Sequence, residues 1–375
     1  MRHEHKRVSP ERQPKGRNPA RTYETPTLEE MPIDPFRSGF VLQRLIEKHN
    51  WRHSKKHKGV SFKTMADRQR FYYWLFNFLR AHPRQFKLDP RTFSGRHVEA
   101  VTQYWQAKAQ AGQMSPATIQ LYFSFMRTFA GWIGKPKLLK PIGSYFSDPR
   151  FYKRSLASGV DKSWRAKGVE VESVIREVET HDVHAAASLK LMHAFHLRFK
   201  EATMLRPHED VISAVQAGHP QSGVAYWLDT HRGTKGGLER MIPIDSVRRE
   251  AAIEYARRVA VGVKDSVSDP RLELTQALRR LRYVMERFGI TRVALGVTPH
   301  GLRHQGAAED YEAMTGEKPP VAGGKAVERK MDRLAREKIA ASLGHGRRQI
   351  TNAYLGGQRR PAAEIPPPSP SPLHG

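Results

Sequence analysis

The sequence predicts a mainly α-helical protein with one small β-hairpin. Apolar residues recur near the 3.6-residue helical period over most of the 375 residues. Two short runs rich in aliphatic and aromatic residues, 224–228 and 240–244, flank a turn-rich stretch, which is typical of a hairpin with a long loop. At roughly 150 residues per domain, the length indicates two or three domains, and 39% hydrophobic residues suffice for buried cores.

The first folded domain is expected over residues 38–140. It follows residues 1–37, whose six prolines and few apolar side chains predict a flexible basic arm. Ser115 and Pro116 mark one helix start, because serine caps helix N-termini and proline fits the first helical position. Four helices are predicted, over about 40–46, 62–80, 94–112 and 115–134.

The second domain is expected over residues 169–357. Prolines and glycines punctuate residues 141–168, which predicts a linker, and residues 358–375 form a proline-rich tail. Besides the hairpin, helices are predicted over about 171–179, 184–195, 246–261, 275–288, 303–314 and 325–343.

A long segment precedes the last of these helices. Residues 317–324 hold two prolines, two glycines and no large apolar residue, so an exposed loop is expected there. In the helix over 325–343, Leu334 is expected on a docked apolar face. Arg336 is expected on a basic face, either free for DNA or a neighbouring protomer or simply solvated.

The composition excludes several classes of protein. Without cysteine there are no disulfides, thiolate nucleophiles or cysteine-based zinc sites. The His-x-x-His spacings at 181/184 and 193/196 lack a third ligand, so no metal site is expected. No apolar run approaches the roughly 18 residues that span a bilayer, and residues 1–21 lack the apolar core of a signal peptide. A cytoplasmic protein without a membrane partner is therefore expected.

The positive charge is large and unevenly distributed. The chain has 64 Lys and Arg against 37 Asp and Glu, a formal net charge of +27. Residues 38–148 carry 19 basic and 5 acidic side chains, a net charge of +14, against +2 for residues 1–37 and +11 for residues 149–375. Uncompensated cations repel one another, and a phosphate backbone would neutralise them. The charge therefore predicts a nucleic-acid partner.

Five short stretches of the second domain place basic, histidine and tyrosine residues in a distinctive order. Each is weak alone, because such patterns arise by chance in any long chain. The stretches are Leu197–Glu201, Gly233–Gly237, His300–His304, Leu343–His345 and Tyr354–Gly356. The whole series in order is a much stronger signal than any one of its parts.

These residue types suit the reversible exchange of a phosphodiester. Tyr354 can act as a nucleophile, and a covalent enzyme–phosphate intermediate would conserve the bond energy without a metal or an energy cofactor. Arg198 and Arg303 can stabilise the negative charge of the transition state, because a guanidinium donates two parallel hydrogen bonds and stays protonated.

Proton transfer needs further groups. Lys235, in the loop of the predicted hairpin, can protonate the leaving 5′ oxygen as general acid. His300 and His345 can donate to phosphate oxygens or relay the tyrosine proton. The candidate catalytic residues are therefore Arg198, Lys235, His300, Arg303, His345 and Tyr354.

The series resembles the tyrosine recombinase (phage integrase) family over about residues 38–357. That family has a helical core-binding domain, of the SAM-like type, followed by a catalytic domain with an Arg, Lys, His-x-x-Arg, His, Tyr series. The separation of His345 and Tyr354, 354 − 345 = 9 residues, is usual in the family. The resemblance implies a site-specific recombinase of a prophage or integrative element, of proteobacterial type.

The resemblance also implies a mechanism and partners. Double-stranded attachment-site DNA would be cleaved through a 3′-phosphotyrosyl link at Tyr354. Four protomers would exchange strands through a Holliday junction, in association with the nucleoid. Accessory DNA-bending or directionality proteins are a further class of partner in such systems.

The chain departs from the family pattern in spacing. Arg303 and His345 are 345 − 303 = 42 residues apart, whereas nearer half of that is usual, and the interval from Arg198 to Lys235 is also long. No arm-binding domain of the lambda type is expected, because residues 1–37 are too few and too proline-rich. Two alternatives stay open: a DNA-relaxing enzyme of the type IB topoisomerase kind, and a non-catalytic DNA-binding regulator.

Overall fold

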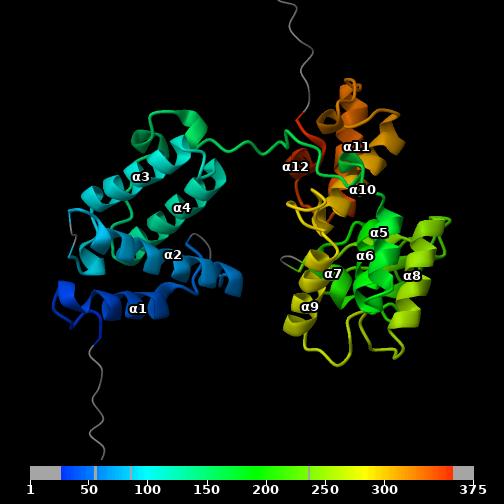
Figure 1. Ribbon diagram of the computed structural model, residues 1–375, viewed down its shortest axis with the longest axis horizontal. Coiled ribbons are helices and arrows are strands. Elements are labelled where there is room, and N and C mark those ends of the chain that lie inside the picture. Colours follow the sequence, from blue (N-terminus) through cyan, green and yellow to red (C-terminus); the bar gives the residue numbers. More distant parts are fainter. Residues whose placement is uncertain (1–26, 55–56, 85–86, 235–236, 358–375) are drawn as a thin grey trace, which may run out of the picture. The chain divides into compact units, whose positions relative to one another are not determined.

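A computed structural model describes residues 27–54, 57–84, 87–234 and 237–357. The chain divides into two compact units, residues 1–154 and 155–375, which Figure 1 shows in blue to green and in green to red. Both are mainly α-helical and the second holds a small sheet, so the predicted fold class is confirmed. Most of the expected arm and all of the expected tail lie outside the described residues. No helix in the described ranges is long and apolar enough to cross a membrane.

Four helices build the first unit. They are α1 (Ser38–His49), α2 (Phe62–Ala81), α3 (Gly95–Gln110) and α4 (Pro116–Trp132). Helix α2 contacts the other three, and its buried face is largely aromatic: the Tyr72 and Phe129 rings lie 5.3 Å apart. The predicted cap of α4 is present, since the Ser115 hydroxyl accepts the Thr118 amide at 3.2 Å.

Segments on both sides of these helices contribute to the same core. Met31 is buried, and the Arg91 guanidinium donates to its carbonyl oxygen at 2.8 Å. Phe146, within the segment expected to be a linker, is buried in the first unit. Trp164, in the same expected linker, is buried in the second unit, where its indole nitrogen donates to the Thr298 carbonyl at 2.8 Å. Residues 141–168 are therefore divided between the two cores.

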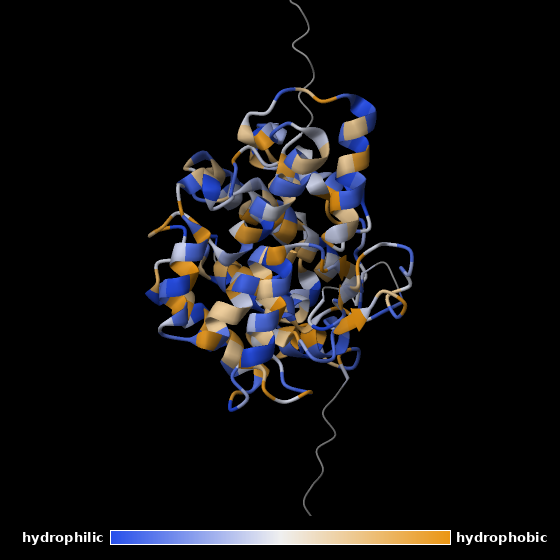
Figure 2. Cartoon of the chain, turned by 90° about the vertical axis from the view of Figure 1, so that its right-hand side faces the viewer, coloured by the Kyte–Doolittle hydropathy of each residue, from blue (hydrophilic) through white to orange (hydrophobic). Residues whose placement is uncertain are grey.

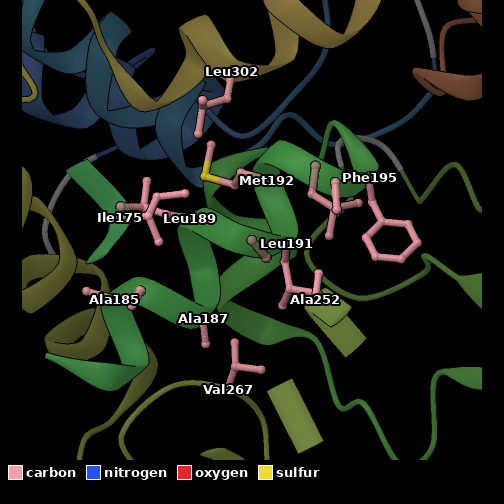
Figure 3. Close-up of a cluster of buried hydrophobic side chains, with 14 of the residues drawn as sticks. Ile175, Ala185, Ala187, Leu189, Leu191, Met192, Phe195, Ala252, Val267 and Leu302 are labelled. Atoms are coloured by element: carbon pink, nitrogen blue, oxygen red, sulfur yellow. The ribbon is translucent and has the colours of Figure 1, made fainter. Parts of the chain in front are cut away.

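Helix α6 (Val183–Phe195) is the centre of the second unit. It is apolar on almost every side, which is typical of a helix surrounded by others. It packs against α5 (Val171–Glu179), α7 (Phe199–Met204), α8 (Val247–Val259) and α10 (Pro299–Thr315). Figure 3 shows Leu189 and Met192 of α6 among the buried side chains of its neighbours, including Leu302 of α10.

The remaining helices of the second unit are α9 (Leu274–Arg287), α11 (Arg329–Ser342) and the single turn α12 (Asn352–Leu355), with a 3₁₀ turn, η6, over Pro320–Ala322. Hydrophobic and hydrophilic residues alternate along most helices (Figure 2), as expected where one face is buried and the other meets solvent.

The sheet has three strands where the sequence predicted two. Strands β1 (Val211–Ser213), β2 (Tyr226–Asp229) and β3 (Met241–Pro243) pair antiparallel in the order β1-β2-β3. Leu228 of β2 faces Val211 on one side and Ile242 on the other. The sequence did not predict β1, because a strand of three residues is too short for an alternating pattern to stand out.

Two expectations about residues 316–343 are wrong. Pro319 and Gly324 are buried, so this segment is packed against the domain and is not simply an exposed loop. On α11, Leu334 is exposed whereas Arg336 is buried, with an exposed fraction of 3%. Helical periodicity identified the helix but assigned these two side chains to the wrong faces.

Candidate active site

The start of α10 places two of the predicted residues. Thr298 precedes the helix and Pro299 occupies its first position, which favours a helix start because proline fixes the backbone angle φ. His300 therefore lies in the first turn, and Arg303 lies one turn further on, facing the core. Close packing fixes this end of the helix, since a Cβ atom on Gly301 would lie 2.7 Å from the Lys162 carbonyl oxygen.

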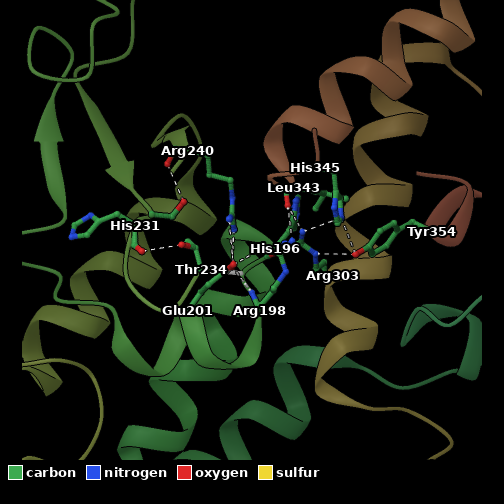
Figure 4. A network of polar contacts seen from close by, with 11 residues as sticks. His196, Arg198, Glu201, His231, Thr234, Arg240, Arg303, Leu343, His345 and Tyr354 are labelled. Carbon is green, nitrogen blue, oxygen red and sulfur yellow. Dashed lines mark hydrogen bonds and ion pairs between the residues drawn. The ribbon is translucent and has the colours of Figure 1, made fainter. Parts of the chain in front are cut away.

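Arg303 is the most deeply buried charge of the site, with an exposed fraction of 0%. Its guanidinium donates to the His196 carbonyl at 2.6 Å, to the Leu343 carbonyl and to the Tyr354 hydroxyl, the last at 3.3 Å (Figure 4). Burial lowers the pKa of Arg303 to about 10, so the group remains charged at neutral pH. A buried charge needs such partners, because an unpaired one costs several kcal/mol.

His196 has an unusual backbone conformation that serves this arrangement. Its φ of 53° lies in the left-handed region, which makes it the sole residue other than glycine with a positive φ within the described ranges. The conformation ends α6 and turns the His196 carbonyl toward Arg303. The imidazole fills a space that only glycine at position 306 leaves open, because a Cβ atom there would lie 1.8 Å from the ring.

A second buried network holds Arg198. Glu201 Oε2 accepts the Arg198 amide at 2.8 Å and Oε1 accepts from the Arg198 guanidinium, while Arg240 donates to Oε2 at 2.8 Å. Burial alone would raise the pKa of Glu201, but the hydrogen bond and charge of Arg240, assisted by Arg198, lower it to about 2. Arg198 also donates to the Leu343 carbonyl at 3.3 Å, so one carbonyl oxygen joins Arg198 to Arg303.

Tyr354 faces this pair of arginines from α12. Its hydroxyl lies 3.3 Å from Arg303 Nε and 3.2 Å from His345 Nε2. The tyrosine ring lies 4.7 Å from the ring of His304 and 6.1 Å from that of His300, measured between centroids. The hydroxyl thus has a cationic donor on one side and an imidazole on the other.

The histidines around Tyr354 are uncharged at neutral pH. Burial, followed by the charge of Arg303, lowers the pKa of both His300 and His345 to about 4. Burial, followed by the neighbouring His300, lowers the pKa of His304 to about 3. An uncharged imidazole can accept a proton, so the Nε2 atom of His345 is able to act as a base toward the Tyr354 hydroxyl.

The structure brings together four of the six predicted residues, Arg198, Arg303, His345 and Tyr354, and places His300 beside them. Lys235 lies outside the described residues. Gly233, two residues earlier in the chain, approaches α7 closely: a Cβ atom on Gly233 would lie 2.9 Å from the Lys200 carbonyl oxygen. In the described ranges, no group of three or more His, Asp or Glu side chains could hold a metal ion.

Three residues of this network had no predicted role: His196, Glu201 and Arg240. Glu201 carried a weak signal, because it follows Arg198 by three residues, the spacing at which side chains meet on a helix. Arg240 and His196 carried none. Arg240 lies 39 residues from its partner Glu201, and the space occupied by His196 depends on a glycine in another helix.

Comparison with known proteins finds a family match for part of the chain. Residues 157–309 match the family model described as Integrase. This part of the chain, most of the second unit, is therefore similar to the integrase family, in agreement with the resemblance found in the motifs. None of the curated proteins searched matches the chain.

Solved structures of lambda integrase share the fold. A lambda integrase dimer bound to a COC′ core site has a TM-score of 0.51 at 13% identity, and the match covers 87% of this chain and 80% of that one. A lambda integrase tetramer bound to a Holliday junction has a TM-score of 0.50, with the same identity and coverage. At this identity the likeness shows the fold alone.

The contact between His196 and Gly306 can be tested with one methyl group. We expect Gly306→Ala to lower the free energy of unfolding of the second unit by about 1–3 kcal/mol, because the new methyl group must displace the imidazole. Gly131→Ala is the matched control, since Gly131 is also helical but has no neighbour within 4 Å of its Cβ position. The control should raise the free energy of unfolding of the first unit, which contains Gly131, by about 0.5–1 kcal/mol. Thermal unfolding of both variants is the measurement, and equal stabilisation by the two alanines would contradict the packing described.

The buried histidines predict that acid destabilises the second unit. Unfolding restores the ordinary histidine pKa of about 6.5, so between that pH and about 4 the unfolded chain binds more protons, and stability falls as pH falls. Asp310 works in the opposite direction, because burial raises its pKa to about 6. Thermal unfolding between pH 7 and pH 4 should show a decreasing midpoint. His304→Gln should reduce that decrease, and identical pH profiles for the variant and the wild-type protein would disprove the assignment.

Proposed function

We propose that the protein is a site-specific DNA recombinase that cleaves and rejoins DNA through a covalent link to Tyr354. The observation that carries the proposal is the position of the Tyr354 hydroxyl, 3.3 Å from Arg303 and 3.2 Å from His345 of the same chain. A hydroxyl between a guanidinium and an uncharged imidazole has a hydrogen-bond donor on one side and a base that can take its proton on the other. The integrase family match supports the same reaction.

In the first step Tyr354 attacks the phosphorus of a DNA phosphodiester. The hydroxyl proton passes to His345, and the tyrosine oxygen forms a bond to phosphorus at the 3′ side of the break. Arg198, whose side chain is partly exposed, would donate to the non-bridging oxygens, and the buried charge of Arg303 would stabilise the negative charge that accumulates there in the transition state. His300, at the first turn of α10, would donate a further hydrogen bond from the ring N–H of its uncharged imidazole.

The bond from phosphorus to the 5′ oxygen breaks in the same step. We assign Lys235 as the acid that protonates this oxygen, since the family series places a lysine in this loop and an ammonium can supply the proton. Attack by a 5′ hydroxyl on the phosphotyrosine then reverses the chemistry and releases Tyr354. The phosphotyrosyl bond conserves the energy of the phosphodiester, so the cycle needs neither a metal nor a high-energy cofactor.

Double-stranded attachment-site DNA is the proposed partner. The net charge of +14 on residues 38–148 favours a duplex, because phosphates neutralise cations and release counterions. Lambda integrase has been seen bound to DNA as a dimer and as a tetramer. By analogy, we propose that four copies of this chain assemble on two sites, with accessory DNA-bending or directionality proteins as further partners and the nucleoid as the location.

Covalent capture tests the proposal and selects the target sequence in the same experiment. The protein is incubated with nicked duplexes that carry a randomised core, and DNA that stays bound after denaturation in detergent is sequenced. We expect the wild-type protein to retain a defined sequence and Tyr354→Phe to retain none, although it still binds duplex DNA, because only the hydroxyl is removed. No adduct with the wild-type protein would favour the non-catalytic regulator. Steady relaxation of plasmids without partner sites would favour the topoisomerase.

The assignment of Lys235 has its own test. Lys235→Ala should slow cleavage of the captured duplex by roughly 10²–10⁴-fold, the usual effect of losing a positioned general acid. A substrate with sulfur at the 5′ bridging position should restore the rate of this variant, because a thiolate leaves without protonation. Arg303→Ala should not be restored, because its loss removes charge stabilisation. Equal failure of both variants on the sulfur substrate would remove Lys235 from this role.

A further inference from the structure

The helix that carries Tyr354 is too short to be stable alone. Helix α12 spans only Asn352–Leu355, and one isolated turn is unfavourable because nucleation fixes several residues for one hydrogen bond. Contacts from the rest of the domain must therefore fix the tyrosine hydroxyl. Leu355 is fully buried, and its apolar packing helps to hold the turn in place. Apolar contacts have no preferred direction, however, so they do not fix the orientation of so short a turn.

One side chain brackets the turn on both sides of Tyr354. Arg336 of α11 donates from Nη1 to the Asn352 side-chain oxygen at 2.9 Å and to the Gly356 carbonyl at 3.1 Å. These two acceptors stand two residues before and two residues after the tyrosine. A single guanidinium nitrogen thus joins the beginning of the turn to its end.

Arg336 is itself anchored to the helix that carries Arg303. Its Nε lies 2.9 and 3.0 Å from the two carboxylate oxygens of Asp332, one turn earlier on α11. Asp332 also accepts the hydroxyl of Tyr311 at 2.8 Å, and Tyr311 lies two turns after Arg303 on α10. All three side chains are buried. The network therefore runs from the helix of one proposed catalytic residue to the turn of the other.

Stability alone does not account for this network. Taking an arginine and an aspartate out of water is costly, and apolar side chains of similar volume often hold helices together equally well. Apolar side chains cannot supply charge-assisted hydrogen bonds of defined direction, which are what Arg336 makes to Asn352 and Gly356. The network therefore serves to orient the turn that carries Tyr354, rather than to stabilise the domain.

We propose that Arg336, held by Asp332 and Tyr311, is a positioning residue that keeps the hydroxyl of Tyr354 in line with Arg303 and His345 of its own chain. The inference rests on the proposed function, in which Tyr354 is the nucleophile. Without the hydrogen bonds from Arg336 to Asn352 and Gly356, α12 frays, and the Tyr354 hydroxyl spends less time within reach of the phosphorus. The hydrogen bonds described for Arg336 go to Asp332, Asn352 and Gly356, and not to Arg198 or Arg303, so binding and activation of the phosphate stay intact.

The main experiment compares two arginines of the same helix. Arg333 also donates from Nε to a carboxylate at 2.9 Å, that of Glu337, but its side chain is 67% exposed. With the duplex selected by covalent capture, Arg336→Met should form the adduct about 10²-fold more slowly, the usual effect of displacing a reacting group by about 1 Å. Arg333→Met should react at the wild-type rate. Asp332→Asn should fall between them, and all three variants should bind the duplex as the wild-type protein does.

A small external nucleophile separates positioning of the tyrosine from damage to the rest of the site. In the Tyr354→Phe background, the hydroperoxide anion from hydrogen peroxide can attack phosphorus in place of tyrosine, and the 5′ oxygen leaves with a proton as before. We expect this cleavage to be the same with and without Arg336→Met. A parallel loss of adduct formation and peroxide cleavage would overturn the proposal, because Arg336 would then support the whole site. An unchanged rate of adduct formation would also overturn it.

Hydrogen exchange of the full-length protein distinguishes failure of this inference from failure of the proposed function. The amides of residues 352–356 should exchange faster in Arg336→Met than in Arg333→Met, with α10 unchanged. Slower or equal exchange in Arg336→Met would show that Arg336 does not hold the turn. If the wild-type protein forms no adduct with any duplex while exchange changes as expected, the proposed function fails and Arg336 holds the turn for another purpose.

Discussion

The second unit depends on the hydrogen bonds that the buried guanidinium of Arg303 makes. A charge with no exposed surface must have its donors satisfied by the protein, because the cost of an unpaired one exceeds what a typical contact contributes. Its partners come from residues 196, 343, 345 and 354, that is, from three segments outside its own helix. Because these three segments must all reach the side chain of Arg303, the end of α6, the end of α11 and the turn α12 are fixed relative to α10.

The electrostatics of the site follow from the same constraint. Arg198, Arg240 and Arg303 contribute three positive charges and Glu201 one negative charge, so this group carries a net charge of +2 at neutral pH. Glu201 accepts hydrogen bonds from both Arg198 and Arg240 and thereby reduces their repulsion. Arg198 and Arg303 both donate to the Leu343 carbonyl. The surrounding histidines are uncharged because burial, followed by the neighbouring cations, lowers their pKa and disfavours protonation.

Local patterns predicted much of this architecture, but not the partners of buried polar groups. Periodicity predicted α2, α3 and α4 almost to their ends, and the ordered motifs named Arg198, Arg303, His345 and Tyr354, which the fold brings together. Whether they are catalytic remains a prediction. Arg336 was assigned to a free face, because its partners lie on α10 and α12 and a helical pattern reports only neighbours three or four residues away.

The long interval between Arg303 and His345 has a structural consequence at the nucleophile. Helices α10 and α11 pack against each other, so His345 returns to Arg303 however long the connection is. The additional residues then occupy space beside α12. Gly356 has a φ of 80°, and a Cβ atom there would lie 2.9 Å from the Val321 amide nitrogen in η6. The connection that looked like an exposed loop thus contacts the turn that carries Tyr354 at its C-terminal end. Arg336 donates to the carbonyl of the same Gly356, so the turn is held there by a hydrogen bond and by a close backbone contact at once.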